Sequence, residues 1–246
     1  MKLVRFVYDS RILQGYMNDK GQIVDESERI YDLNQVCLLP PVHPGKIIGL
    51  ARNFQVENKP NGNSMLPEPI VFLKGLNTCT GHKQDIVVPE EVHQLIYEIE
   101  LAVVIAKTCK NVTAEHAMDY VLGYTIANDL TARDFLTSDM QPSVKSKSFD
   151  GFCPLGPYLV TKDEIQDPHD LKMTVCVNGE VRQTGSTRDM IFKIPEIISY
   201  VSEFMTLDAY DVILTGAPKP VTTVHAGDTL SLKIHQLGVL ENRFVH

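Results

Sequence analysis

The sequence has no tryptophan, and its five cysteines are widely spaced without a CxxC pair. An odd number of isolated cysteines argues against a disulfide framework and against a thiolate zinc site. No run of 18 apolar residues occurs, and charge interrupts the N-terminal stretch before a signal peptide's apolar segment could form. We therefore expect a protein of the reducing cytoplasm with no membrane segment.

Basic residues are also in short supply, with 23 Lys and Arg against 31 Asp and Glu and a formal net charge of -8. No Lys/Arg-rich run occurs, which argues against a nucleic-acid surface. There is no GxGxxG motif and no P-loop, so nothing supports nucleotide binding. An acidic protein repels anions at long range, so an acidic substrate would need local cations or a metal.

Short apolar runs bounded by Gly, Pro, Asn or Asp are present along most of the 246 residues, and they predict strands. The predicted strands are 47–50, 70–73, 86–88, 99–105, 158–160, 173–177, 211–214 and 230–234. Asn178-Gly179 is the strongest hairpin signal, since this pair suits the positive φ angles of a type I′ turn. The fold class predicted from these patterns is a β-rich α+β fold.

Helical patterns are few. Thr113 can cap a helix that ends at Gly123, and Pro195 suits the start of a second helix with an apolar stripe through residue 205. Three prolines and a glycine in 39–45 predict a linker, which divides the chain into a unit of residues 1–42 and a unit of residues 43–246. The polar segment 53–67 predicts a long loop.

Two carboxylates in a predicted strand carry the most chemical information. Glu98 and Glu100 flank Ile99 at the start of the apolar run 99–105, so the period of two points both acids to one face. Burying two unpaired carboxylates together costs several kcal/mol, and a divalent cation would remove that conflict. The alternative is an exposed strand end with both acids in water.

A third acid, Asp129, ends the apolar run 123–128 and could complete a site made only of oxygen ligands. Such a donor set favours Mg²⁺, with Mn²⁺ and Ca²⁺ as alternatives. Three carboxylates would leave about three of six octahedral positions for water or substrate. That arrangement is typical of a catalytic metal.

The pattern Glu98-x-Glu100 followed by Ala127-Asn128-Asp129 resembles the metal site of the fumarylacetoacetate hydrolase family. The stretches 69–74, 131–134, 147–157 and 215–218 also fit, and the similarity runs in the family's order from about His43 to the C-terminus. It implies a fumarylacetoacetate hydrolase-type β-roll with a small N-terminal appendage, residues 1–42. Residues 177–183 and 200–207 are similar to the catalytic half of the homoprotocatechuate-pathway bifunctional isomerase/decarboxylase, which is built from two fused copies of the domain.

Carried over residue by residue, the resemblance implies that Glu98, Glu100 and Asp129 bind the metal, Mg²⁺ or Mn²⁺. It also assigns catalytic and substrate-binding roles to other residues. The implied catalytic residues are Lys147, which faces the substrate beside the metal, Lys74 and Glu57. The implied substrate-binding residues are Arg133, Thr215 and Asn53.

The chain departs from the family pattern at two places. Family hydrolases carry a His-Glu pair as the general base for water, and Glu57 and Pro60 stand at those positions here. Hydrolysis is therefore not expected, although Glu57 could still act as a base if its loop buried it and raised its pKa. Ala217 replaces the second threonine of the family's Thr-Gly-Thr-Pro, which removes one substrate hydroxyl contact.

The resemblance implies metal-dependent decarboxylation and/or keto–enol isomerisation of an unsaturated oxo-carboxylic acid from aromatic (homoprotocatechuate) catabolism. An alternative enzyme is a C–C bond hydrolase of the acylpyruvate or fumarylpyruvate type. An alternative outside enzymes is an inactive scaffold subunit. Because the bifunctional relative packs two copies together, we expect a homodimer or a dimer with a related subunit.

Overall fold

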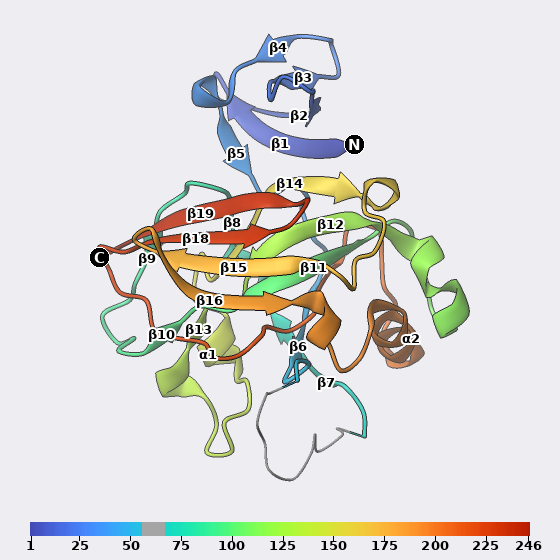
Figure 1. The fold of residues 1–246 in the computed structure, drawn as a ribbon, viewed down its shortest axis with the longest axis vertical. Coiled ribbons are helices and arrows are strands. Elements are labelled where there is room, and N and C mark those ends of the chain that lie inside the picture. The colour runs from blue at the N-terminus through green and yellow to red at the C-terminus, as the bar shows by residue number, and fades with distance from the viewer. Residues whose placement is uncertain (56–66) are drawn as a thin grey trace.

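The computed structural model describes residues 1–55 and 67–246, and strands dominate these residues (Figure 1). The strands are β1 (Lys2–Tyr8), β2 (Arg11–Met17), β3 (Ile23–Asp25), β4 (Ile30–Tyr31), β5 (Cys37–Leu39), β6 (Ile47–Ala51), β7 (Ile70–Lys74), β8 (Cys79–Thr80), β9 (Ile86–Val87), β10 (Leu95–Ile96), β11 (Ile99–Ile105), β12 (Val121–Asn128), β13 (Thr131–Ala132), β14 (Cys153–Thr161), β15 (Lys172–Val177), β16 (Glu180–Ser186), β17 (Val212–Leu214), β18 (Thr229–Ile234) and β19 (Gly238–Val245). The α-helices are α1 (Val144–Lys147) and α2 (Ile194–Phe204). Short 3₁₀ helices occupy Leu33–Gln35, Leu76–Thr78, Ala114–Tyr120, Arg133–Phe135, Lys162–Glu164 and Thr187–Asp189. The β-rich fold class predicted from the sequence is confirmed.

The largest sheet has the strand order β4-β3-β2-β1-β14-β12-β11-β17-β6-β7, with β5 added beside β1 and β8 beside β14. Its N-terminal strands β1–β5 lie at one end of the long axis of the molecule (Figure 1). They are continuous with the rest of the sheet, because Lys2 and Leu3 of β1 pair with Val160 and Leu159 of β14. The division of the chain after residue 42 stays a prediction.

Strand β11 lies in the middle of this sheet and is buried along its whole length. Its alternate side chains enter two separate apolar cores: Leu101 and Val103 pack in the larger one, and Ala102 and Val104 in the smaller one. The period of two explains this division, and it places Glu100 on the same face as Ala102. The strand that carries Glu100 is thus packed on both faces.

A second sheet has the order β16-β15-β18-β19-β9. Its β15–β16 hairpin turns at Asn178 and Gly179, which have φ angles of 51° and 82°. These positive values are those of the predicted type I′ turn. The hairpin prediction is confirmed.

The helix predicted from Thr113 to Gly123 is wrong in kind and in length. Thr113 does precede a helix, but this is a 3₁₀ helix that ends at Tyr120, and β12 begins at Val121. Gly123 lies inside that strand, where a Cβ would meet the Val160 carbonyl oxygen at 2.2 Å. It is therefore a glycine because β14 approaches closely, not because a helix ends there.

The second predicted helix is present as α2, where Pro195 occupies the first turn. Its apolar stripe packs through Ile197, Ile198 and Val201, whereas Phe204 at its end is exposed. Neither α-helix of residues 1–55 and 67–246 has the length and hydrophobicity needed to cross a bilayer.

Candidate active site

The register of β11 and β12 brings the three predicted acids together. Ile99 pairs with Asn128 in this antiparallel ladder, so Glu98 lies across from Asp129. The Asp129 amide donates to the Glu98 carbonyl over 2.9 Å, and the Asn128 side chain accepts from the Glu98 amide over 3.1 Å. One carboxylate oxygen from each of Glu98, Glu100 and Asp129 lies within 4.8 Å of the other two.

Two of these carboxylates are buried and all three are close to one another, which sets their electrostatics. Glu100 is 2 % exposed and Asp129 is 1 % exposed. Burial, followed by the charges of Asp129 and Glu98, raises the pKa of Glu100 well above its usual range. Burial acts in the same direction on Glu98, but the ammonium groups of Lys147 and Lys219 outweigh it and lower the pKa of Glu98 to about 2.

Lys147 reaches the acids from α1, the single helical turn that Ser143 begins. The Ser143 hydroxyl accepts from the Ser146 amide over 3.0 Å, and this N-cap fixes the turn. The Lys147 ammonium donates to Glu98 over 2.8 Å and also to Asp129. Burial alone would lower the pKa of Lys147, but the carboxylates of Asp129 and Glu98 outweigh it and raise that pKa, so the group stays cationic.

Lys74, at the end of β7, pairs with one of the same acids. Its ammonium donates to Asp129 over 2.7 Å and to the Leu130 carbonyl over 3.2 Å, and its side chain is fully buried. It does not line the pocket described next. Contact with a substrate is therefore not what this geometry supports; Lys74 holds Asp129 in position.

The carboxylates open into a pocket of about 480 Å³. Its polar lining includes Glu98, Glu100, Asp129, Lys147, Thr131, Arg52, Arg133 and Lys219, and its apolar lining includes Leu50, Phe72, Ile96, Leu136 and Val221. The volume is that of a small-molecule site. Acids at the base, cations around them and apolar walls suit a small organic anion.

The other predicted site residues differ in whether they line this pocket. Arg133 is exposed and lines the pocket. Asn53 and Thr215 are not among the described residues that line it: the Asn53 amide donates to the carbonyls of Phe192 and Thr215, and the Thr215 hydroxyl donates to the Leu101 carbonyl. A substrate contact by either stays a prediction that this geometry does not support. Glu57 and Pro60 lie outside the described residues.

Sequence reasoning missed two contributors from the segment that follows β17. The Lys219 ammonium donates to Glu98 over 3.2 Å, and the Gly216 amide donates to Glu100 over 2.6 Å. Gly216 has a φ of 91°, and a Cβ there would lie 3.0 Å from that of Asn53. The sequence marked residues 215–218 only as part of the family pattern, and nothing in it showed that Lys219 would contact Glu98.

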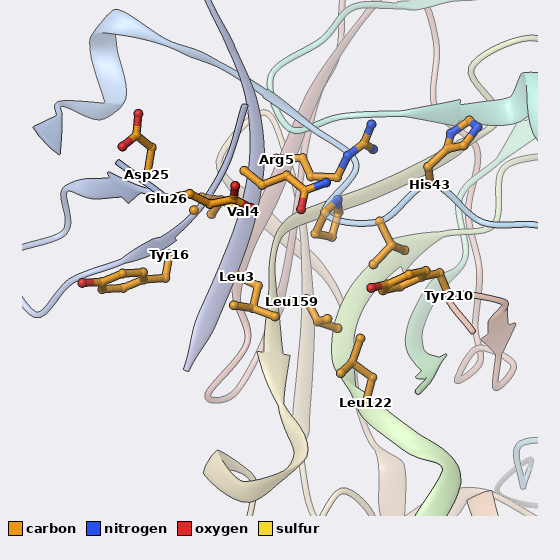
Figure 2. A pocket seen from close by; sticks show the side chains of 14 residues that line it. Leu3, Val4, Arg5, Tyr16, Asp25, Glu26, His43, Leu122, Leu159 and Tyr210 are labelled. Carbon is orange, nitrogen blue, oxygen red and sulfur yellow. The ribbon is translucent and has the colours of Figure 1, made fainter. Parts of the chain in front are cut away.

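A second cavity, of about 540 Å³, lies between the N-terminal strands and the rest of the large sheet. Figure 2 shows Tyr16 and Tyr210 on opposite sides of it in this view, with Leu3 and Leu159 between them. Its buried acid, Asp25, already accepts hydrogen bonds from the Tyr31 hydroxyl and from two backbone amides. Because that carboxylate is satisfied by structural contacts, the cavity lacks the chemistry of the first pocket.

The first pocket's donor set fits a divalent cation. All three candidate ligand groups are carboxylates, which suits Mg²⁺ and Mn²⁺ better than softer metals. Burial and the two neighbouring carboxylates raise the pKa of Glu100, and a cation bound at the three acids would favour its charged form. Glu98, Glu100 and Asp129 would hold the cation.

A family model described as the C-terminal part of fumarylacetoacetate hydrolase matches residues 46–245. The chain belongs to the fumarylacetoacetate hydrolase family. It is 43% identical over 226 residues to the 4-hydroxyphenylacetate degradation bifunctional isomerase/decarboxylase of Salmonella dublin, with 92% of this chain and 52% of that protein aligned. The chain thus spans about half of that relative.

Other members of this family are also similar. A human mitochondrial oxaloacetate tautomerase is 40% identical over 221 residues, which are 86% of this chain and 70% of that protein. The crystal structure of 2-hydroxyhepta-2,4-diene-1,7-dioate isomerase from Mycobacterium marinum has a TM-score of 0.87 at 33% identity and covers 100% of this chain and 98% of its own. Maleylpyruvate hydrolase from Sphingobium sp. SYK-6, solved with manganese(II) and pyruvate, has a TM-score of 0.84 at 29% identity over 100% of this chain and 99% of its own.

Proposed function

We propose that this protein is a metal-dependent decarboxylase and/or keto–enol isomerase that acts on an unsaturated oxo-carboxylic acid of aromatic catabolism. One observation carries the proposal: Glu98, Glu100 and Asp129 converge at the base of a 480 Å³ pocket, with the Lys147 ammonium beside them. The isomerase/decarboxylase names of similar proteins support the reaction type.

Both reactions place negative charge on the 2-oxo oxygen of the substrate, either when CO₂ leaves or when the enol proton, or in the reverse direction a carbon-bound proton, is removed. A divalent cation held by the three acids would supply Lewis-acid stabilisation of that charge. Lys147 adds a fixed positive charge and N–H donors, and its raised pKa keeps them available. Donors already in place where charge develops are usually the largest contribution to catalysis.

Proton transfer separates isomerisation from decarboxylation. Decarboxylation needs only an electron sink, whereas keto–enol isomerisation needs a group that moves a proton between the enol oxygen and a carbon of the substrate. Glu98 is a weak base, because Lys147 and Lys219 hold its pKa at about 2 against the effect of burial. We propose Glu57 for this role on the sequence pattern, and its place lies outside the described residues.

Two alternatives share this site. Hydrolysis of an acylpyruvate needs a base for water, and the family's His-Glu pair is replaced by Glu57 and Pro60 in the sequence. Oxaloacetate tautomerisation proceeds through the same kind of enolate and is supported by the 40% identical human protein. The intact acidic group and Lys147 argue against an inactive scaffold.

The test is an activity comparison in Mg²⁺ with an EDTA control. We expect CO₂ release from 5-oxopent-3-ene-1,2,5-tricarboxylate, or an absorbance change from 2-hydroxyhepta-2,4-diene-1,7-dioate, that exceeds turnover of oxaloacetate enol and of an acylpyruvate. Glu100→Gln should abolish it, whereas Glu203→Gln, at an exposed acid on α2, should not. Faster turnover of the acylpyruvate would support the hydrolase instead.

A further inference from the structure

The cations around the active-site pocket fall into two groups. Lys74, Lys147 and Lys219 each form an ion pair with one of the predicted metal-binding acids. Arg52 and Arg133 line the same pocket, and neither forms an ion pair with an acid of residues 1–55 or 67–246. Two guanidinium groups therefore remain to meet an anion that enters the pocket.

Arg133 follows a strand that contacts the acids. It follows β13, whose Thr131 hydroxyl lies 3.1 Å from the Glu98 carboxylate. Arg52 comes from another strand, because it directly follows β6, and its guanidinium donates to the Asp139 carbonyl over 3.3 Å. The two arginines thus reach the pocket from different strands.

The sheet register gives the separation of Arg52 from the metal-binding acids. Leu214 of β17 pairs with Gly49 of β6 and with Ala102 of β11. Two residues farther along, the same register places position 51 and Glu100 on either side of position 216. Neighbouring strands are about 4.8 Å apart, so the backbone at Arg52 lies about 10 Å from that of Glu100.

The backbone at Arg52 is unusual for a side chain of its size. Its φ is 60°, in the left-handed region that a residue with a Cβ seldom adopts. The next residue holds this turn in place, because Asn53 is buried and bonds to Phe192 and Thr215 through three hydrogen bonds. Strained residues held this firmly cluster at ligand sites.

We propose that Arg52 binds the distal carboxylate of a seven-carbon 2-oxo diacid and thereby selects substrates by chain length. This inference rests on the proposed function, in which the 2-oxo end lies at Glu98, Glu100 and Asp129. The six carbon–carbon bonds of such a diacid span about 7 Å when extended, which is enough to approach Arg52 across the pocket. Oxaloacetate has three such bonds and spans about 3.5 Å, so its second carboxylate stays near the acids.

Calorimetric binding in Mg²⁺ tests this without turnover. The probes are saturated 2-oxo diacids of five, six and seven carbons, together with 2-oxoheptanoate, which has the same chain as the longest diacid but no distal carboxylate. A charged hydrogen bond to the distal group should make the wild type prefer the seven-carbon diacid over 2-oxoheptanoate by about 10- to 100-fold. Arg52→Ala should remove most of that preference, and its effect should grow with chain length.

Two controls complete the design. Arg52→Lys keeps the charge and should retain part of the preference, whereas Arg182→Ala, at an exposed arginine paired with Glu180, should retain all of it. An Arg52→Ala variant that keeps the preference, or that weakens all three diacids equally, overturns the inference. If the preference behaves as expected but the unsaturated seven-carbon diacid is not turned over, the proposed function fails and the role of Arg52 stands.

Discussion

Replacing Glu100 by glutamine tests whether this residue is a metal ligand or a structural carboxylate. Glu100 is 2 % exposed, and it accepts a hydrogen bond from the Gly216 amide over 2.6 Å. Glutamine has nearly the same shape and keeps an oxygen that can accept this bond. The substitution therefore removes one negative charge and little else.

Without metal, this loss of charge should not destabilise the protein. Burial and the neighbouring Asp129 and Glu98 already raise the pKa of Glu100, so its charged form is the unfavourable one. Two unit charges at the 4.8 Å that bounds this cluster repel by about 3 kcal/mol at an effective dielectric constant of about 20. We expect Glu100→Gln to have a free energy of unfolding in EDTA equal to or above that of the wild type.

With Mg²⁺ the order should reverse. At a concentration 100 times Kd, binding stabilises the wild type by about 2.7 kcal/mol, which corresponds to an increase in Tm of about 5–10 °C for a chain of this size. If the lost carboxylate weakens Mg²⁺ binding about 100-fold, the same concentration stabilises the variant by only about 0.4 kcal/mol. In EDTA the variant should thus be at least as stable as the wild type, whereas in Mg²⁺ the wild type should be the more stable protein.

Thermal unfolding followed by circular dichroism in EDTA and in Mg²⁺ measures both effects, with calorimetry for Kd. Glu203→Gln is the matched control, because it removes an exposed carboxylate far along the chain from the cluster. A Glu100→Gln protein that keeps the full Mg²⁺-induced shift would show that Glu100 is not a ligand. A variant that unfolds much more easily in EDTA would show that its charge has a structural role.

Three further predictions concern other parts of the molecule. Lys74→Met should lower the free energy of unfolding by about 3–5 kcal/mol in urea titrations, because it leaves the buried Asp129 without one of its cations; a loss below about 1 kcal/mol would contradict this. The His169 imidazole accepts from the Ile194 amide at the start of α2, and burial, followed by Lys193, lowers its pKa. The unfolded imidazole therefore takes up a proton first, so stability should fall as the pH drops below about 6.5, and His169→Gln should show a shallower fall in urea midpoints. Light scattering should give a dimer, twice 27.6 kDa, and a monomer at micromolar concentration would refute it.

The acidic cluster could be predicted from the sequence because it depends on two local rules. A period of two fixes which side chains of a strand share a face, and an apolar run that ends in Asn-Asp fixes where the strand stops. The pairing of β11 with β12 then adds only the register that sets Glu98 across from Asp129. The local patterns still allowed an exposed strand end, and the family resemblance was what selected the three acids as one site.

The surroundings of the cluster could not be predicted in the same way. Lys74 and Lys219 reach it from segments 55 and 121 residues away from their partners, along paths that no local pattern specifies. The helix expected at Thr113 failed for a related reason. Its apolar spacing fits a helix, but Val121 and Gly123 pair with residues of β11 and β14 in the sheet. Such tertiary pairing overrides a local helical pattern.

Charge balance around the pocket indicates what the site can accept. Among the described residues there, three carboxylates face three lysine ammonium groups, so their charges cancel and two arginines leave an excess of +2. A divalent cation would raise that excess to +4, enough to balance a tricarboxylate at −3. The chain as a whole carries −8 and repels such an anion, but salt screens charges beyond about 8–10 Å, so only the pocket's own charges act on a bound substrate. Loss of the metal would therefore lower the positive excess as well as remove a Lewis acid, and substrate affinity should fall together with the rate.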